Sequence, residues 1–170
     1  MGVDHLSKIE PCLWFDDRAE EAANFYVSVF SARRATMPDG GEPKILGVSR
    51  YGEAGPGPAG SVMTVEFLLE GQEFLALNGG PEFTFTPAIS LIVNCETQEE
   101  VDQLWETLSE GGLKGECGWL EDRYGVSWQI VPTVLTELLD DPNPERSQRV
   151  MRAMLEMDKL DIARLRRAAE

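Results

Sequence analysis

The stretch that decides the fold is CLWFDDRAEEAANFYVSVF, residues 12–30. It opens with an apolar run typical of a β-strand and passes through two aspartates. Asp17 and Glu20 have the spacing of a capping box, which marks the start of a helix. Apolar residues then recur at the helical spacing of one buried face: Ala22, Phe25, Tyr26, Val29 and Phe30. The segment therefore predicts a strand followed directly by an amphipathic helix.

The same order of signals returns in the second half of the chain. AISLIVNCE, residues 88–96, is another apolar strand, and Thr97 with Glu100 forms a second capping box. A second apolar stripe at helical spacing follows: Val101, Leu104, Trp105 and Leu108. Gly111-Gly112 ends this helix, because glycine commonly terminates helices. The chain thus contains the same strand–helix unit twice.

Strand-like segments follow each predicted helix. They lie at 32–38, 44–52, 61–70 and 73–79 after the first helix, and at 112–122 and 125–132 after the second. The Gly/Pro-rich stretch 53–60 is typical of a mobile surface loop. We therefore expect an α+β fold in which two βαβββ modules, at 8–79 and 88–133, form one domain (1–133) around a shared cleft.

The rest of the chain, residues 134–170, predicts a C-terminal helical extension. PTVLTELLDDPNPE (132–145) indicates a short helix ended by Pro142 and Pro144. Residues 145–169 indicate one long helix with a broad apolar face, formed by Val150, Met154, Met157 and Leu160. That face either packs on its own domain or forms a dimer contact, and the pattern fits both.

Composition limits the compartment and the partners. The chain has 170 residues, of which 42% are hydrophobic, and its formal net charge is -15. Such an acidic body repels nucleic acid and anionic lipid, so we expect neither as a partner. The charge either maintains solubility or attracts a cationic ligand.

The N-terminus lacks the pattern of a signal peptide, and no apolar run is long enough to span a membrane. Cys12, Cys95 and Cys117 lack metal-ligand spacing and indicate reduced thiols in a cytoplasmic protein.

Several segments in a fixed order resemble a known family. They are CLWFDDRAEEAANFYVSVF, GQEFLALNGGPEFTFTPAISL, the span 100–105, CGWLEDRYGVSWQIVP and VMRAMLEMDKLDIARL. Together they resemble the PhnB-like branch of the glyoxalase/bleomycin-resistance/extradiol dioxygenase (vicinal oxygen chelate) superfamily, often labelled 3-demethylubiquinone-9 3-methyltransferase. The resemblance covers residues 8–165 and implies the paired βαβββ fold and a homodimer.

The resemblance also indicates where a metal would bind. Metal-dependent relatives place ligands on the first and last strands of each module. The positions that correspond here are Glu10 or Pro11, Leu75, Ala76 or Asn78, Ala88 or Ser90, and Gln129. The only histidine, His5, precedes the first strand. Because a transition-metal site normally needs three or four N, O or S ligands, we expect no metal. No Gly-rich loop joins a strand to a helix, so we also expect no methyl-donor cofactor.

Candidate ligand contacts lie on the predicted strands. Trp14, Trp119 and Trp128 either line the cleft or pack in the core, since only alternate strand residues face inward. The amides of Asn78, Asn94 and Gln129 could contact a planar organic ligand.

Catalytic candidates are few. Glu66 and Glu10 are the candidate bases, and Glu66 stands out as a carboxylate within an apolar strand. Cys117 lacks a histidine to activate it, which favours a structural thiol. These residues favour a protein that binds a small molecule in a metal-free cleft. An enzyme of the same superfamily, or the methyltransferase of the label, is the alternative, and an accessory domain is a third hypothesis.

Overall fold

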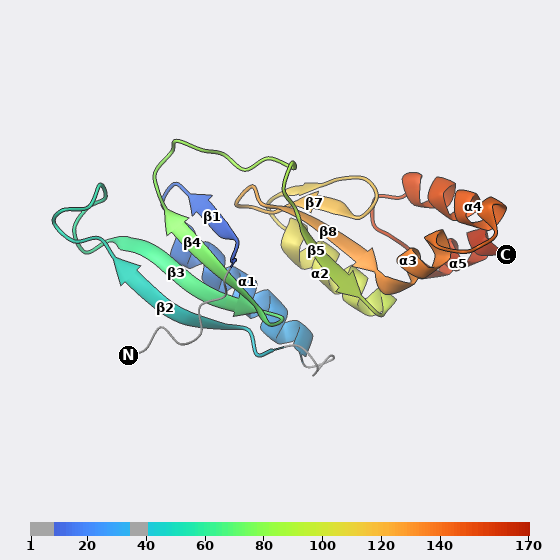
Figure 1. The fold of residues 1–170 in the computed structure, drawn as a ribbon, viewed down its shortest axis with the longest axis horizontal. Coiled ribbons are helices and arrows are strands. Elements are labelled where there is room, and N and C mark those ends of the chain that lie inside the picture. Colours follow the sequence, from blue (N-terminus) through green and yellow to red (C-terminus); the bar gives the residue numbers. More distant parts are fainter. Residues whose placement is uncertain (1–8, 35–40) are drawn as a thin grey trace. The chain divides into compact units, whose positions relative to one another are not determined.

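The computed structural model describes residues 9–34 and 41–170. The chain divides into two compact units, Met1–Thr84 and Phe85–Glu170, and each contains one βαβββ module (Figure 1). No helix among the described residues is long and apolar enough to cross a membrane.

Module one consists of one helix and a four-stranded sheet. Its elements are β1 (Cys12–Phe15), α1 (Ala19–Arg34), β2 (Lys44–Arg50), β3 (Val62–Leu69) and β4 (Gln72–Asn78). The strand order is β1-β4-β3-β2, in which β1 runs parallel to β4 and the other pairs are antiparallel. Helix α1 carries the chain from β1 to β2 at the opposite edge of the sheet, and β4 later returns to pair with β1 in parallel.

Helix α1 covers one face of this sheet. Tyr26 of α1 stacks on Phe67 of β3 at 6.1 Å between ring centroids, and Phe67 stacks on Phe74 of β4 at 5.3 Å. Alternate residues of the strands, such as Phe15 and Val65, are buried on this side. The buried, alternate residues of the strands thus pack against the apolar face of the helix that the sequence predicts within residues 12–30.

Module two repeats the arrangement. It contains β5 (Leu91–Cys95), α2 (Gln98–Ser109), β6 (Leu113–Lys114), β7 (Trp119–Glu121) and β8 (Ser127–Pro132), in the order β5-β8-β7-β6. The predicted capping box is present: the Glu100 amide donates to Thr97 Oγ1 (3.2 Å), and the Thr97 amide donates to Glu100 Oε2 (3.3 Å). The predicted α+β fold of two βαβββ modules is therefore confirmed.

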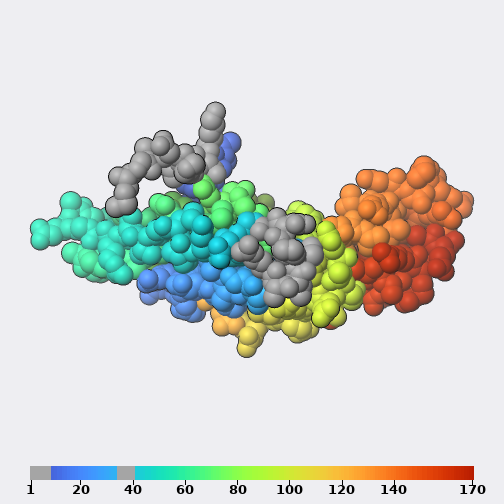
Figure 2. Space-filling model, turned by 90° about the horizontal axis from the view of Figure 1, so that it is seen from below, coloured from blue at the N-terminus to red at the C-terminus, as the bar shows by residue number. Residues whose placement is uncertain are grey.

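Three helices follow β8: α3 (Thr133–Leu139), α4 (Pro144–Leu155) and α5 (Ile162–Ala169). The prediction of one long helix at 145–169 is wrong, because residues 156–161 interrupt it. Asp161 caps α5 by accepting a hydrogen bond from the Arg164 amide at 2.7 Å. The helices close on a cluster of buried apolar side chains: Leu135, Val150, Met157, Leu160 and Leu165. In Figure 2 this segment, coloured orange to red, is closely packed.

Another prediction differs from the structure. The strand expected at 32–38 is wrong over 32–34, which belong to α1; its remainder lies outside the described residues, as does His5. Loop 52–60 folds over the Tyr51 ring, since Cβ atoms on Gly55 and Gly57 would overlap that ring.

The three C-terminal helices belong to the same unit as module two. The grouping of both modules into one domain, 1–133, with a separate extension, 134–170, stays a prediction.

Candidate ligand-binding faces

The sheet of module one has a second face, which α1 does not cover. Its side chains alternate with the buried ones and remain partly exposed. Cys12, Leu75 and Glu66 form one row across β1, β4 and β3. Trp14, Leu77 and Thr64 form the next row across the same three strands. We call this surface the open face of module one.

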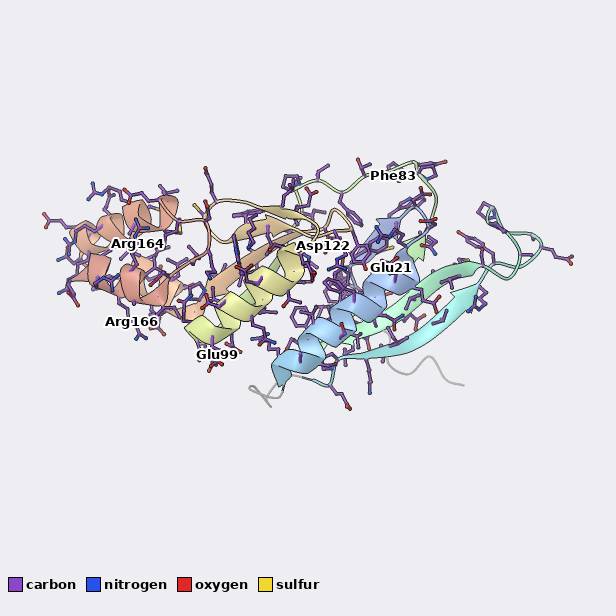
Figure 3. The ribbon with its side chains drawn as sticks, turned by 180° about the vertical axis from the view of Figure 1, so that it is seen from behind. Glu21, Phe83, Glu99, Asp122, Arg164 and Arg166 are labelled. Carbon is purple, nitrogen blue, oxygen red and sulfur yellow. The ribbon has the colours of Figure 1, made fainter. Side chains whose placement is uncertain are left out.

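Trp14 is held in one orientation on the open face. Its Nε1 donates a hydrogen bond to the Gly80 carbonyl at 2.9 Å. The indole lies against the backbone at Gly79, where a Cβ atom would overlap it. Phe83, labelled in Figure 3, meets the indole edge-on at 5.0 Å between centroids. The ring is partly exposed, so it offers a pre-positioned aromatic wall.

The carboxylate of Glu66 lies on the same face. It is partly exposed, and Leu75 and Gly47 are its cross-strand neighbours on β4 and β2. The sequence could not decide which way Glu66 points; the structure places it opposite the side covered by α1. Glu10, the other candidate base, precedes β1 and is also partly exposed.

Module two also has an open face. Ile92, Gln129 and Trp119 form a row across β5, β8 and β7. Ile92 is 58% exposed, and Trp119 and Gln129 are partly exposed. Gln129 Nε2 donates to Ser90 Oγ at 2.9 Å, which fixes the amide along the edge of the sheet. Asn94, on β5, is also exposed.

Two predicted ligand contacts have structural partners instead. Trp128 is 2% exposed on the α2 side of its sheet, where its Nε1 donates to Asp122 Oδ2 at 2.8 Å. Of the two alternatives for Trp128, lining the cleft or packing in the core, the structure shows packing in the core. Asn78 Oδ1 accepts from the Ala19 amide (2.8 Å) and Asn78 Nδ2 donates to the Val62 carbonyl (3.2 Å). The Asn78 side chain thus caps α1 and ties it to β3.

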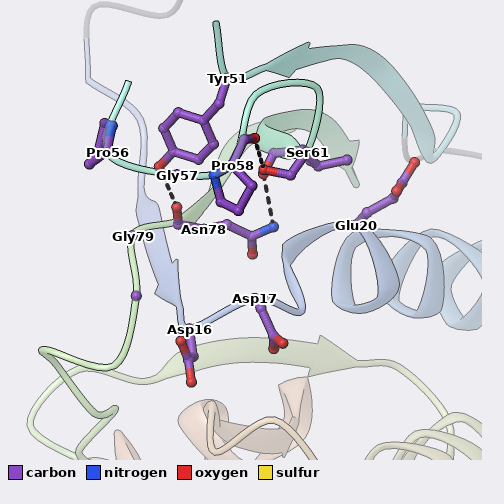
Figure 4. A pocket seen from close by; sticks show the side chains of 12 residues that line it. Asp16, Asp17, Glu20, Tyr51, Pro56, Gly57, Pro58, Ser61, Asn78 and Gly79 are labelled. Atoms are coloured by element: carbon purple, nitrogen blue, oxygen red, sulfur yellow. Dashed lines mark hydrogen bonds between the residues drawn. The ribbon is translucent and has the colours of Figure 1, made fainter. Parts of the chain in front are cut away.

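A cavity of about 500 Å³ lies at the end of module one (Figure 4). Asp16, Asp17 and Glu20 line it from the β1–α1 connection and the first turn of α1. Tyr51 donates a hydrogen bond from its hydroxyl to the Asn78 carbonyl at 2.6 Å, which joins the two strand ends behind the cavity. The sequence did not predict this cavity, because loops far apart in the chain build it.

The thiols on and near these faces are poor nucleophiles. Burial raises the pKa of Cys12, and the neighbouring Glu10 carboxylate raises it further. Burial also raises the pKa of Cys117, with smaller contributions from Glu116 and Asp158. Because only the thiolate attacks, a raised pKa lowers reactivity at neutral pH.

The donors do not fit the metal site of the superfamily. Among residues 9–34 and 41–170, no three His, Cys, Asp or Glu side chains come together as metal ligands. On β4 the open face carries the apolar Leu75, Ala76 is buried, and Asn78 caps α1.

The connections between strands and helices do not fit a methyl-donor loop either. Such a loop uses glycine so that its backbone can approach the cofactor. Residues 16–18 join β1 to α1, and residues 96–97 join β5 to α2. Neither connection contains glycine.

Comparison with known proteins places this fold in a family. Residues 7–131 match the family described as 3-demethylubiquinone-9 3-methyltransferase. A PhnB protein from Bacillus cereus is 40% identical, with a TM-score of 0.63; the match covers 75% of this chain and 100% of that one. A Pseudomonas aeruginosa protein shares the fold at 21% identity and a TM-score of 0.56, over 75% of this chain and 98% of that one. None of the curated proteins matches. As its sequence segments predicted, the chain belongs to the PhnB-like 3-demethylubiquinone-9 3-methyltransferase family.

Proposed function

We propose that this protein binds a small, planar organic ligand on the open face of module one, without a metal. The observation that carries the proposal is the state of Trp14, which is fixed by Gly79, Gly80 and Phe83 yet stays partly exposed. An aromatic ring that is already immobilised loses little entropy when a ligand stacks on it.

The rest of this face suits the same ligand. Leu75 and Leu77 supply an apolar floor beside the indole, and Glu66 and Thr64 supply polar groups. Ligand sites typically combine apolar walls with a few polar groups that fix orientation. In module two, Trp119, Ile92 and Gln129 offer the same combination, so its open face is a second surface for such contacts.

The alternative is methyl transfer, which the family description names. That description also names a quinone, whose planar ring agrees with a flat, apolar binding face. The strand-to-helix connections carry no glycine loop for a methyl donor. Saturable binding of S-adenosylmethionine, measured by calorimetry, would support the enzyme over the binding protein.

The first test is a titration with 2-naphthamide, a neutral planar probe. We expect Trp14→Ala to weaken its binding about 2- to 10-fold, because an aromatic contact contributes roughly 0.5–1.5 kcal/mol. Isothermal titration calorimetry gives the Kd. Leu155→Ala, which removes an apolar side chain that is 59% exposed on α4, is the control for non-specific adsorption. Equal Kd values for wild type and Trp14→Ala would refute a site at this indole.

We also propose that the protein is a cytoplasmic homodimer. The family resemblance supports the dimer, and the thiols of Cys12, Cys95 and Cys117, which form no disulfide, are compatible with a reducing compartment. Light scattering on a size-exclusion column should give twice the mass of the chain. A single-chain mass at micromolar concentration would contradict the dimer.

A further inference from the structure

Glu66 is surrounded by apolar or uncharged neighbours on the open face of module one. Leu75 lies beside it on β4, and Gly47 lies beside it on β2. Thr64 and Leu68 precede and follow it on the same face of β3. Among the described residues, no cationic side chain forms an ion pair with Glu66. Two charged residues, Lys44 and Glu73, lie in the next row, paired with Leu68.

A bulge brings Gly47 opposite this carboxylate. The register of β2 shifts between Ile45 and Gly47, so that Leu46 is the extra residue and Gly47 pairs with Glu66. The side chain of Leu46 is 44% exposed. Bulges of this kind re-aim side chains beside functional sites.

Neither backbone conformation nor packing requires glycine at position 47. Gly47 is not among the glycines with positive φ, so an L side chain could adopt its backbone conformation. A Cβ atom there would meet only the Glu66 carboxylate, at 3.5 Å from Oε2 and 4.0 Å from Cδ, which is ordinary van der Waals contact. The physical effect of the missing side chain is therefore to leave Glu66 open to approach from the β2 side.

We propose that Glu66 selects ligands that carry a cationic nitrogen donor, such as an aromatic amidine, and that Gly47 keeps the carboxylate accessible to that donor. This inference rests on the proposed ligand site. The ring of the ligand lies toward Trp14, which is two strands away and one row further along the sheet, so that the two Cα positions are about 12 Å apart at the usual strand spacing and rise. The chain's net charge of -15 also favours the approach of a cation.

Two probes of the same shape test the charge. 2-Naphthamidine is cationic at neutral pH, and 2-naphthamide is neutral. We expect calorimetry to show that wild type binds the amidine at least about 10-fold more tightly, because hydrogen bonds between charged groups are roughly twice as strong as neutral ones. Glu66→Gln should bring the two Kd values together without weakening the amide.

Gly47→Val tests access to the carboxylate. Valine suits a strand, and its side chain would cover the β2 side of Glu66. We expect the variant to lose most of the preference for the amidine while binding the amide within about 2- to 3-fold of wild type, a change well under 1 kcal/mol. Glu53→Gln, in loop 52–60, makes the same change in net charge away from the sheet and should leave both Kd values unchanged. Circular dichroism melting checks that each variant is folded.

The outcomes separate the two proposals. If wild type binds both probes equally, or if Glu66→Gln keeps the preference for the amidine, the role of Glu66 is refuted and the ligand site stands. If Glu53→Gln abolishes the preference as well, bulk charge rather than Glu66 causes it. If neither probe binds to wild type, the proposed function fails and this inference fails with it.

Discussion

Asp122→Ala should lower the free energy of unfolding of module two by about 3–5 kcal/mol, since each buried donor left without an acceptor costs roughly 1–3 kcal/mol. Asp122, labelled in Figure 3, is 1% exposed. Its Oδ1 accepts hydrogen bonds from the Tyr124 amide (2.8 Å) and the Val126 amide (3.0 Å), and its Oδ2 accepts one from Trp128 Nε1 (2.8 Å). One carboxylate thus organises the β7–β8 turn and fixes the indole in the core.

Urea unfolding followed by tryptophan fluorescence measures this effect, because Trp105 of α2, which is 2% exposed, reports on module two in every variant. Asp122→Asn is the matched variant: it keeps the side-chain volume and one oxygen acceptor, so it should cost less than alanine. Trp128→Phe removes one donor and keeps an aromatic ring. The double variant Asp122→Ala/Trp128→Phe should then cost less than the sum of the two single changes. Additive costs would mean that the Asp122–Trp128 hydrogen bond stabilises nothing.

The same residue shows the limit of sequence reasoning about this site. The sequence left Trp128 as a candidate for either the cleft or the core, and it gave no local signal that Asp122 would hold the indole. Alternation along a strand separates its two faces but does not say which face a helix covers. Trp119 and Trp128 therefore looked equivalent, although they lie on opposite faces of neighbouring strands. Only the positions of α2 and Asp122 distinguish them.

Local patterns predicted the elements far better than contacts between distant segments. Thr97 and Glu100 are three residues apart, so their capping box was visible in the sequence and is present. For α1 the sequence predicted a capping box of Asp17 and Glu20, but the helix begins at Ala19, whose amide donates to Asn78, 59 residues away. The cavity at the end of module one was missed for the same reason. The break at 156–161 did have a local signal, namely Asp161 as an N-cap three residues before Arg164.

The orientation of Glu66 follows from the same argument. Its strand, VMTVEFLL, is apolar on both sides of the carboxylate, so the sequence leaves both orientations possible. The burial of Val65 and Phe67 against α1 places Glu66 on the opposite face. The bulge at Leu46, which sets Gly47 opposite Glu66, depends on the pairing of β2 with β3 and has no local signal. The ligand proposals therefore depend on the structure, whereas the fold could be predicted from the sequence.

Leu160→Ala should cost about 2–5 kcal/mol of stability, the range for truncating a large buried aliphatic side chain. Leu160 is 1% exposed, lies in the apolar cluster of the C-terminal helices, and packs close to Gly118, where a Cβ atom would lie 3.1 Å from its Cδ1. Hydrogen bonds hold the same segment to module two: the Cys117 amide donates to the Met157 carbonyl (2.7 Å), and Gln98 Nε2 donates to the Leu160 carbonyl (3.1 Å). The cavity would therefore open where the helices meet the module.

The effect of Leu160→Ala should reach beyond the C-terminal helices. Because the backbone of 157–160 accepts hydrogen bonds from Cys117 and Gly118, just before β7, and from Gln98 of α2, loosening this segment should destabilise module two as a unit. The fluorescence and far-UV circular dichroism transitions should then shift together. Leu155→Ala, with the same chemical change at a position 59% exposed, should stay within about 0.5 kcal/mol of wild type. If Leu160→Ala instead melts the helices first while the tryptophan transition stays in place, the C-terminal helices form a separate folding unit, and module two is stable without them.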